Sequence, residues 1–203
     1  EQLGLTNSKL FISSFDRKNL SIEVRGQVQK KKKLQEIVNF IGKRKNESGI
    51  IYCLSRKNTE EVASFLKNEG HSVAFYHAGM NHEERESTQT DFINDDTKII
   101  VATIAFGMGI DKSNVRWVIH YNMPKNIEGY YQEIGRAGRD GLDASTYLFY
   151  SYGDIVMLKK FALDSGQADI QLAKLESMQK YAEALTCRRK ILLSYFNEIL
   201  EEN

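Results

Sequence analysis

Two arginines stand three positions apart among glycines in the string YYQEIGRAGRDG, Tyr130–Gly141. The segment that leads into Arg136 and Arg139 has a helical pattern from Ile127, so this spacing could place both guanidinium groups on one face. The glycines keep the backbone slim and allow a close approach. Arginine suits a planar, charged partner such as phosphate. The pair therefore indicates a phosphate site, although a solvated helix end with two surface arginines would show the same spacing.

The bulk composition is that of an ordinary globular protein. The 203 residues are 41% apolar and 27% charged with a net charge of +1, so a nucleic-acid surface would have to be a local patch. Two cysteines suit a reducing compartment, and no run is apolar enough to cross a membrane. The chain starts at Glu1 without a methionine. We expect a piece of a longer intracellular protein, either cytoplasmic (nucleoid-associated) or nuclear.

Two local features predict ordinary structure rather than a site. The run Lys30–Lys33 falls at the start of a predicted helix, where cations oppose the helix dipole. We expect a solvated helix end there rather than a DNA-binding arm. Cys53 lies among apolar neighbours in a predicted strand, so we expect it to be a small core residue.

Short apolar runs alternate with amphipathic segments before residue 152. Each run is rich in β-branched or aromatic residues and is apolar at successive positions, as is typical of strands buried on both faces of a parallel sheet. The predicted strands are Ile50–Leu54, Val73–Tyr76, Ile99–Ala102, Trp117–Tyr121 and Tyr147–Tyr150.

The segments between the strands carry helical signals. Apolar residues recur at helical spacing over residues 34–41. Asn58 and Glu61 have the spacing of a capping box, as do Asn81 and Glu84. Repeated β-α units predict an α/β fold with a doubly wound, mainly parallel sheet.

The pattern divides the chain into three parts. Residues 1–24 resemble a connector between domains. Residues 25–152 form the predicted α/β lobe, whose roughly 130 residues are a normal domain size. Residues 153–203 read as helical throughout, which predicts a helical appendage rather than a continuation of the sheet.

The string at Tyr130–Gly141 resembles motif VI of superfamily 2 helicases, and in this form it is similar to the RecQ family of DNA helicases. Tyr131-Gln132-Glu133 differs from DEAD-box RNA helicases, which typically carry His-Arg ahead of the glycines. The likeness runs from about Phe11 to Phe196. Its other strings are GIIYCLSR (Gly49–Arg56, like motif IV), YHAGM (Tyr76–Met80), VATIAFGMGIDK (Val101–Lys112, like motif V) and TCRRKILLSYF (Thr186–Phe196, like the entry to the RecQ zinc-binding subdomain).

The resemblance implies a RecA-like fold, related to P-loop NTPases, that serves as lobe two of a two-lobe motor. The sequence has no G-x-x-x-x-G-K-[ST] loop and no Asp-Glu pair for magnesium. In the family these belong to the N-terminal RecA-like lobe, which would be the partner of this chain. The chain alone should therefore not hydrolyse ATP. The whole protein would use ATP and Mg²⁺ to move 3′ to 5′ on single-stranded DNA and to unwind duplex DNA.

The resemblance also implies roles for the residues that complete the ATP site. Arg139 would be the arginine finger, and Arg136 a second cation that faces phosphate. Gln132 could orient the attacking water or couple the two lobes. Asp111 could reach the ribose, pair with an arginine or form a buried structural ion pair. Gly109 belongs to the same nucleotide-binding string.

A DNA track would run past the carboxyl ends of the predicted strands, where open α/β sheets bind ligands. Backbone amides, hydroxyl groups and a few cations there would contact phosphates without reading bases. His77 could equally cap a helix or fill a core position. The candidate DNA-binding residues are Ser55, Arg56, His77, Gly79, Thr103 and Gly107.

Cys187 matches the first of four zinc ligands in RecQ proteins. Structural zinc needs about four Cys or His ligands, and no Cys or His follows Cys187 before Asn203. We therefore expect Zn²⁺ in a longer protein and not in this chain.

Two other functions stay open. The chain could be a nucleic-acid-binding adaptor without activity, although the presence of Gln132, Arg136 and Arg139 argues against this. It could instead be a lobe of an RNA helicase, although the motif details and the TCRR string favour DNA.

Overall fold

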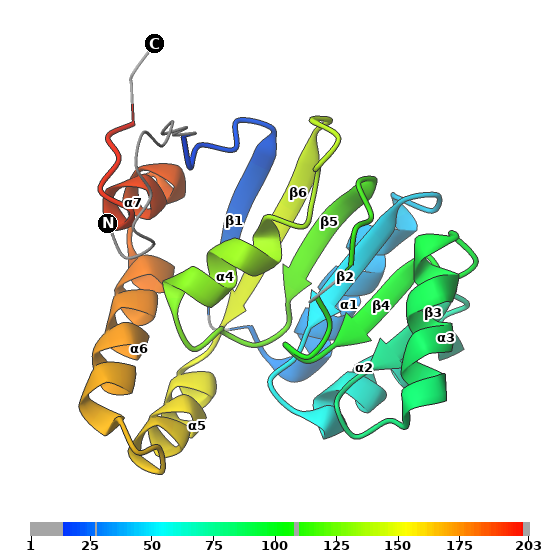
Figure 1. Ribbon diagram of the computed structural model, residues 1–203, viewed down its shortest axis with the longest axis horizontal. Helices are drawn as coiled ribbons and strands as arrows, with labels where there is room; N and C mark the ends of the chain where they lie inside the picture. The colour runs from blue at the N-terminus through cyan, green and yellow to red at the C-terminus, as the bar shows by residue number, and fades with distance from the viewer. Residues whose placement is uncertain (1–13, 27, 108–109, 201–203) are drawn as a thin grey trace, which may run out of the picture.

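Six parallel strands form one sheet in the order β1-β6-β5-β2-β4-β3 (Figure 1). This computed structural model describes residues 14–26, 28–107 and 110–200. The predicted α/β fold with a parallel sheet is confirmed, because the central strands are apolar runs buried on both faces. The strands are β1 (Leu20–Gly26), β2 (Ser48–Tyr52), β3 (Val73–Tyr76), β4 (Ile99–Ala102), β5 (Val115–His120) and β6 (Ala144–Tyr150).

Strand β1 corrects the predicted boundary at residue 24. It pairs with β6 from Leu20 opposite Ala144 to Gly26 opposite Tyr150, so residues 20–24 belong to the sheet and not to a connector. As an edge strand it is only partly buried, and it therefore alternates apolar and polar residues instead of forming an apolar run. A continuous apolar run marks a buried central strand, and an edge strand such as β1 does not have one.

Helices cover both faces of the sheet and form two cores. On one face, Ile37 of α1 (Lys30–Gly42) and Leu66 of α2 (Arg56–Asn68) pack with Ile51. On the other face, Phe92 of α3 (His82–Ile93) and Tyr130 of α4 (Ile127–Ile134) pack with Tyr52 and its neighbours. The doubly wound arrangement follows from this two-sided burial.

One of the two predicted capping boxes is present. Asn81 and Glu84 cap α3 as expected, with each side chain bound to the other residue's backbone N–H. The box predicted at Asn58 and Glu61 is wrong, because α2 begins earlier and Ser55 accepts the Asn58 N–H. Glu61 instead binds Lys30 of α1 at 2.7 Å.

The prediction that residues 153–203 are helical throughout is wrong, because this appendage consists of three helices with breaks between them. These are α5 (Tyr152–Leu163), α6 (Ala168–Glu183) and α7 (Arg188–Tyr195). Helices α6 and α7 stand beside the β1 edge of the sheet, and α5 packs against α6 (Figure 1). Leu175, Met178 and Tyr181 of α6 are buried in the core that α4 also enters. Within the described residues, no helix is long and apolar enough to span a membrane.

The two residues expected to be structural have different outcomes. Cys53 is 3% exposed, so its predicted core position is confirmed, and burial raises the pKa of its thiol. Lys33 is 5% exposed, which makes the predicted solvated helix end wrong at this position. Its ammonium group donates to the carbonyl of Tyr121 at 2.7 Å and lies over that residue's ring, while burial lowers its pKa.

Candidate functional site

The two predicted phosphate-binding arginines, Arg136 and Arg139, lie in a turn and not in a helix. Helix α4 ends at Ile134, and residues 135–143, which we call the arginine turn, lead from it to β6. Gly138 and Gly141 have φ values of 58° and 82°, a left-handed conformation that glycine adopts without strain. The expectation that one helical face presents both guanidinium groups is therefore wrong.

The turn nevertheless directs both arginines to the segment that follows β4. Arg136 Nη1 donates to the carbonyl of Gly107 at 2.5 Å, and Arg139 Nη1 donates to the carbonyl of Ile110 at 2.9 Å. Arg139 also pairs with Asp111 at 3.3 Å. The Asp111 side chain is 95% exposed, so this is a surface pair and not the buried pair considered above. Gly109 lies outside the described residues.

Gly107 lets Arg136 lie directly on the backbone. Its φ is 149°, and a Cβ atom there would stand 2.2 Å from Arg136 Nη2. Arg136 Nε is buried and has no hydrogen-bond partner among the described residues. A buried N–H without a partner is costly, so this guanidinium group is suited to an additional acceptor.

A cavity of about 860 Å³ opens at the carboxyl ends of the strands. Thr103, Gln132 and Arg136 line it, so the structure brings these three predicted residues together. The appendage closes the opposite side of the cavity with Leu158, Phe161 and Leu175. Arg139 is not among its lining residues and lies with Ile110 and Asp111 instead.

Behind Arg136 lies a buried polar cluster that we did not predict. His120 Nε2 and Glu133 Oε2 are 2.7 Å apart, with side-chain exposures of 1% and 11%. The ring of Tyr52 stacks on His120, and its hydroxyl donates to the carbonyl of Phe106 at 3.2 Å. Burial raises the pKa of Tyr52, and the positive charge of Arg136 opposes that rise. The sequence held one signal, because Glu133 occupies the apolar face of α4 three residues after Tyr130.

The candidate DNA-binding residues form a group beside β2 and β3 and a second group after β4. Ser55 is the N-cap of α2, and the Arg56 guanidinium group lies against Gly79, where an added Cβ would be 2.9 Å from it. His77 is 6% exposed, accepts the Gly79 N–H through Nδ1 and binds Glu60 through Nε2 at 2.8 Å. The imidazole of His77 is therefore buried and stabilises the loop between β3 and α3.

Gly107 departs from the DNA group. Its contacts place it with Arg136, so it belongs to the arginine side of the site. Thr103 remains at the carboxyl end of β4, where its side chain faces the cavity.

Known proteins share both parts of this architecture. A family model described as helicase conserved C-terminal domain matches residues 29–141, and a model described as RecQ zinc-binding matches residues 152–203. The chain belongs to the helicase C-terminal domain family, in its RecQ form.

Relatives extend over nearly the whole chain. It is 47% identical over 199 residues to the ATP-dependent DNA helicase RecQ of Haemophilus influenzae, which covers 97% of this chain and 32% of that protein. A protein of Acanthamoeba polyphaga mimivirus, whose name is "Putative ATP-dependent RNA helicase R290", is 49% identical over 98% of this chain and 37% of its own length. The chain spans about a third of the length of these relatives.

Solved structures of other proteins share the fold. A structure of Saccharomyces cerevisiae Dbp5 bound to Gle1 and IP6 has a TM-score of 0.63 at 22% identity and covers 83% of this chain and 41% of its own. A DEAD box protein from Methanococcus jannaschii has a TM-score of 0.61 at 24% identity, over 73% and 40% of the two chains. At these identities the likeness concerns the fold alone.

The RecQ-type appendage does not form a zinc site from the residues described. Cys187 is exposed at the N-cap position of α7. In residues 14–26, 28–107 and 110–200, no group of three or more His, Cys, Asp or Glu could hold a metal ion. Zinc binding at Cys187 therefore stays a prediction for a longer protein.

Proposed function

We propose that this chain is the second motor lobe of an ATP-dependent DNA helicase that moves 3′ to 5′ on single-stranded DNA. The observation that carries the proposal is the convergence of Arg136 and Arg139 on Gly107, Ile110 and Asp111, between β4 and β5. Arg136 also lines the cavity at the carboxyl ends of the strands, where α/β proteins bind ligands. The direction of movement rests on the likeness to RecQ helicases. The partners would be single-stranded and duplex DNA and an N-terminal RecA-like lobe.

In this proposal the arginine turn supplies positive charge to the reaction. Arg139 is about one-third exposed and acts as the arginine finger, since it can turn from the surface carboxylate of Asp111 to a phosphate. Arg136 acts as a second cation through its free Nε. Gln132 is exposed at the same cavity and is placed to hold a water molecule.

The described residues fit one side of an ATP site. They offer two guanidinium groups but no carboxylate cluster for Mg²⁺, so we assign the metal ligands to the other lobe. When bound, ATP with Mg²⁺ supplies the phosphoryl group that is transferred to water. The part of this chain is to place Arg136 and Arg139 where negative charge develops.

The DNA track in this proposal follows the first group of candidate residues. Ser55, Arg56 and Gly79 form one surface beside β2 and β3, and Thr103 continues it toward the cavity. This surface offers a cation and hydroxyl groups, which suit phosphate contacts without base reading. His77 acts indirectly, because its ring holds Gly79 and Glu60.

The first test is ATP turnover by the full-length protein with and without single-stranded DNA, beside its Arg139→Ala variant. We expect DNA-stimulated turnover in the wild type and a loss of about 10³-fold or more in the variant, with nucleotide affinity largely kept. Arg25→Ala removes a half-exposed arginine of β1 and serves as the matched control. Normal turnover in Arg139→Ala would reject the finger assignment and favour the adaptor function.

A second candidate function is an RNA-driven motor, which the name of the mimivirus relative favours. Comparing single-stranded DNA with RNA of the same sequence as activators of ATP turnover separates the two. We expect the larger stimulation from DNA.

A further inference from the structure

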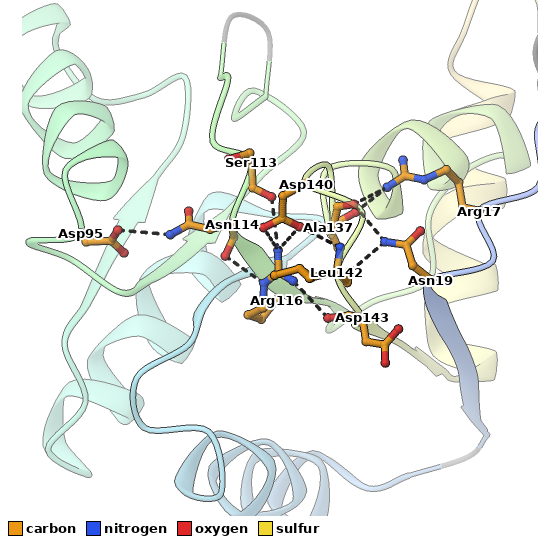
Figure 2. A network of polar contacts seen from close by, with 11 residues as sticks. Arg17, Asn19, Asp95, Ser113, Asn114, Arg116, Ala137, Asp140, Leu142 and Asp143 are labelled. Atoms are coloured by element: carbon orange, nitrogen blue, oxygen red, sulfur yellow. Dashed lines mark hydrogen bonds and ion pairs between the residues drawn. The ribbon is translucent and has the colours of Figure 1, made fainter.

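An arginine far away in the sequence binds the backbone of the arginine turn. Arg17 precedes β1, yet its Nη2 donates to the carbonyls of Ala137 and Gly138, both at 2.9 Å, and its Nη1 donates to that of Gly135 at 3.3 Å. Figure 2 shows this side chain reaching the turn from the opposite side to β5. One of these carbonyls directly precedes Arg136, and the other two lie between Arg136 and Arg139 in the sequence.

These contacts satisfy the carbonyls of Gly135 and Ala137 and add a donor to that of Gly138, which also accepts the Gly141 N–H. A helix end exposes its last carbonyls, and here the chain continues into left-handed glycines instead of another helical turn. The guanidinium group presents several donors in a fixed plane and carries the charge that favours a helix C-terminus. One side chain can therefore hold three successive parts of the turn at once.

Asn19, two residues after Arg17, also binds the backbone of the arginine turn. Its Nδ2 donates to the carbonyl of Gly138 at 2.9 Å and to that of Leu142 at 2.8 Å. A Cβ atom at Gly138 would stand 2.4 Å from this nitrogen, so the contact requires glycine. Gly138 lies between Arg136 and Arg139. Arg17 and Asn19, about 120 positions earlier in the sequence, both bind its carbonyl.

The segment that carries Arg17 is itself fixed to the appendage. Arg189 of α7 donates to the carbonyl of Arg17 at 2.7 Å and to the carboxylate of Asp16 at 2.5 Å. On the outer side of the turn, Arg116 of β5 binds Asp140 at 2.6 Å (Figure 2). The turn is therefore held from two sides, and Arg17 holds the side that leads to α7.

We propose that Arg17 is a positioning residue for ATP turnover, which fixes the turn so that Arg136 points to Gly107 and Arg139 to Ile110 and Asp111. The inference rests on the proposed function of these two arginines. In the described hydrogen bonds, the Arg17 guanidinium group donates only to backbone carbonyls of the turn, so the effect of this side chain on the reaction passes through the turn.

The test measures kcat and KM for ATP in the full-length protein with saturating single-stranded DNA, for Arg17→Ala, Arg17→Lys and the control Arg25→Ala. Displacing a catalytic group by about 1 Å costs up to ~100-fold, so we expect Arg17→Ala to lower kcat about 10- to 100-fold while KM changes less than about threefold. Lysine offers one ammonium group for three carbonyls, so we expect an intermediate kcat for Arg17→Lys. Arg25→Ala should match the wild type.

A purely structural role for Arg17 would lower the melting temperature and the folded fraction but leave kcat per folded molecule unchanged. That result in Arg17→Ala, or in Arg17→Lys where the alanine variant does not fold, would overturn the inference. In the Arg139→Ala background, Arg17→Ala should lower kcat by a smaller factor than in the wild type, because the part of its effect that passes through Arg139 is already lost. If Arg139→Ala is inactive and Arg17→Ala is normal, only the positioning role fails. If Arg139→Ala is active, the proposed function fails with it.

Discussion

At the scale of single residues, the site depends on a glycine, Gly107, that leaves room for Arg136. Arg136 lies against Gly107 because that residue has no Cβ atom, and its φ of 149° is a conformation that other residues rarely adopt. The guanidinium group also donates to the same residue's carbonyl. Gly107, in the connection that follows β4, thus fixes the orientation of the Arg136 side chain.

Gly107→Ala should therefore displace Arg136. The added methyl group would overlap the guanidinium group, so we expect DNA-stimulated ATP turnover to fall at least about tenfold, as for a misplaced catalytic group. Gly42→Ala is the matched control, because a Cβ there meets nothing within 4 Å. We expect that variant to turn over ATP normally. Unchanged kcat in Gly107→Ala would show that the position of Arg136 does not limit the reaction.

At the scale of elements, one carboxylate joins several of them. Asp95 lies between α3 and β4 with a φ of 68° and accepts from Ser48 of β2, Lys98 and Asn114, while pairing with Lys112 at 3.0 Å. Burial works to raise its pKa, but the hydrogen bonds from these groups together hold the pKa well below its usual range. The buried ammonium group of Lys112 depends on this carboxylate for its compensating charge.

Asp95→Asn should destabilise the protein by roughly 1–3 kcal/mol at neutral pH, since several donors lose a charged acceptor. The pKa of Asp95 is lower in the folded state than its unfolded value of about 3.9, so its stabilising effect is complete above that value. The effect is lost as the pH falls toward the folded-state pKa.

Chemical denaturation between pH 7 and pH 3 would measure this difference in unfolding free energy. We expect the gap between wild type and Asp95→Asn to shrink below about pH 4. Asp96→Asn changes the neighbouring exposed carboxylate and should show little gap at any pH. A gap for Asp95→Asn that stays constant with pH would contradict the assigned pKa direction.

At the scale of the whole molecule, the appendage is fastened to the sheet at two distant points. Asp154 of α5 accepts from Asn122 at 2.8 Å and from the backbone of Met123, next to the cavity. At the other end, Arg189 of α7 binds Asp16 and the carbonyls of Arg17 and Leu20. The RecQ-type appendage therefore touches both the cavity and the segment that holds the arginine turn.

Arg189→Ala should loosen the second of these attachments. The Asp16 side chain is 12% exposed and would lose its charged partner, so we expect a loss of roughly 1–3 kcal/mol and faster amide exchange in α7 and residues 14–20. Hydrogen exchange read by mass spectrometry would locate the change. Lys180→Ala removes an exposed pair of α6 and should leave exchange unaltered. Exchange that rises equally across the sheet would indicate general destabilisation instead.

The sequence alone determined the parallel α/β fold and the capping box of α3, and it supplied candidate site residues that stay predictions. These follow from local patterns, since buried parallel strands are apolar at successive positions and a capping box spans four residues. The family likeness rested on equally local strings such as Tyr130–Gly141. By contrast, the half-exposed edge strand β1 was missed, because its alternating pattern is weaker than a continuous apolar run.

Only the tertiary structure decided which residues meet. Arg136 and Arg139 reach residues 107–111 from a turn, His120 finds Glu133 in the core, and Arg17 binds carbonyls about 120 positions away. Such contacts depend on the order of strands in the sheet, which places β1 beside β6 and β5 beside β2. Propensity and periodicity act over a few residues, whereas strand order is set by packing the whole chain, so local patterns could name these residues but not pair them.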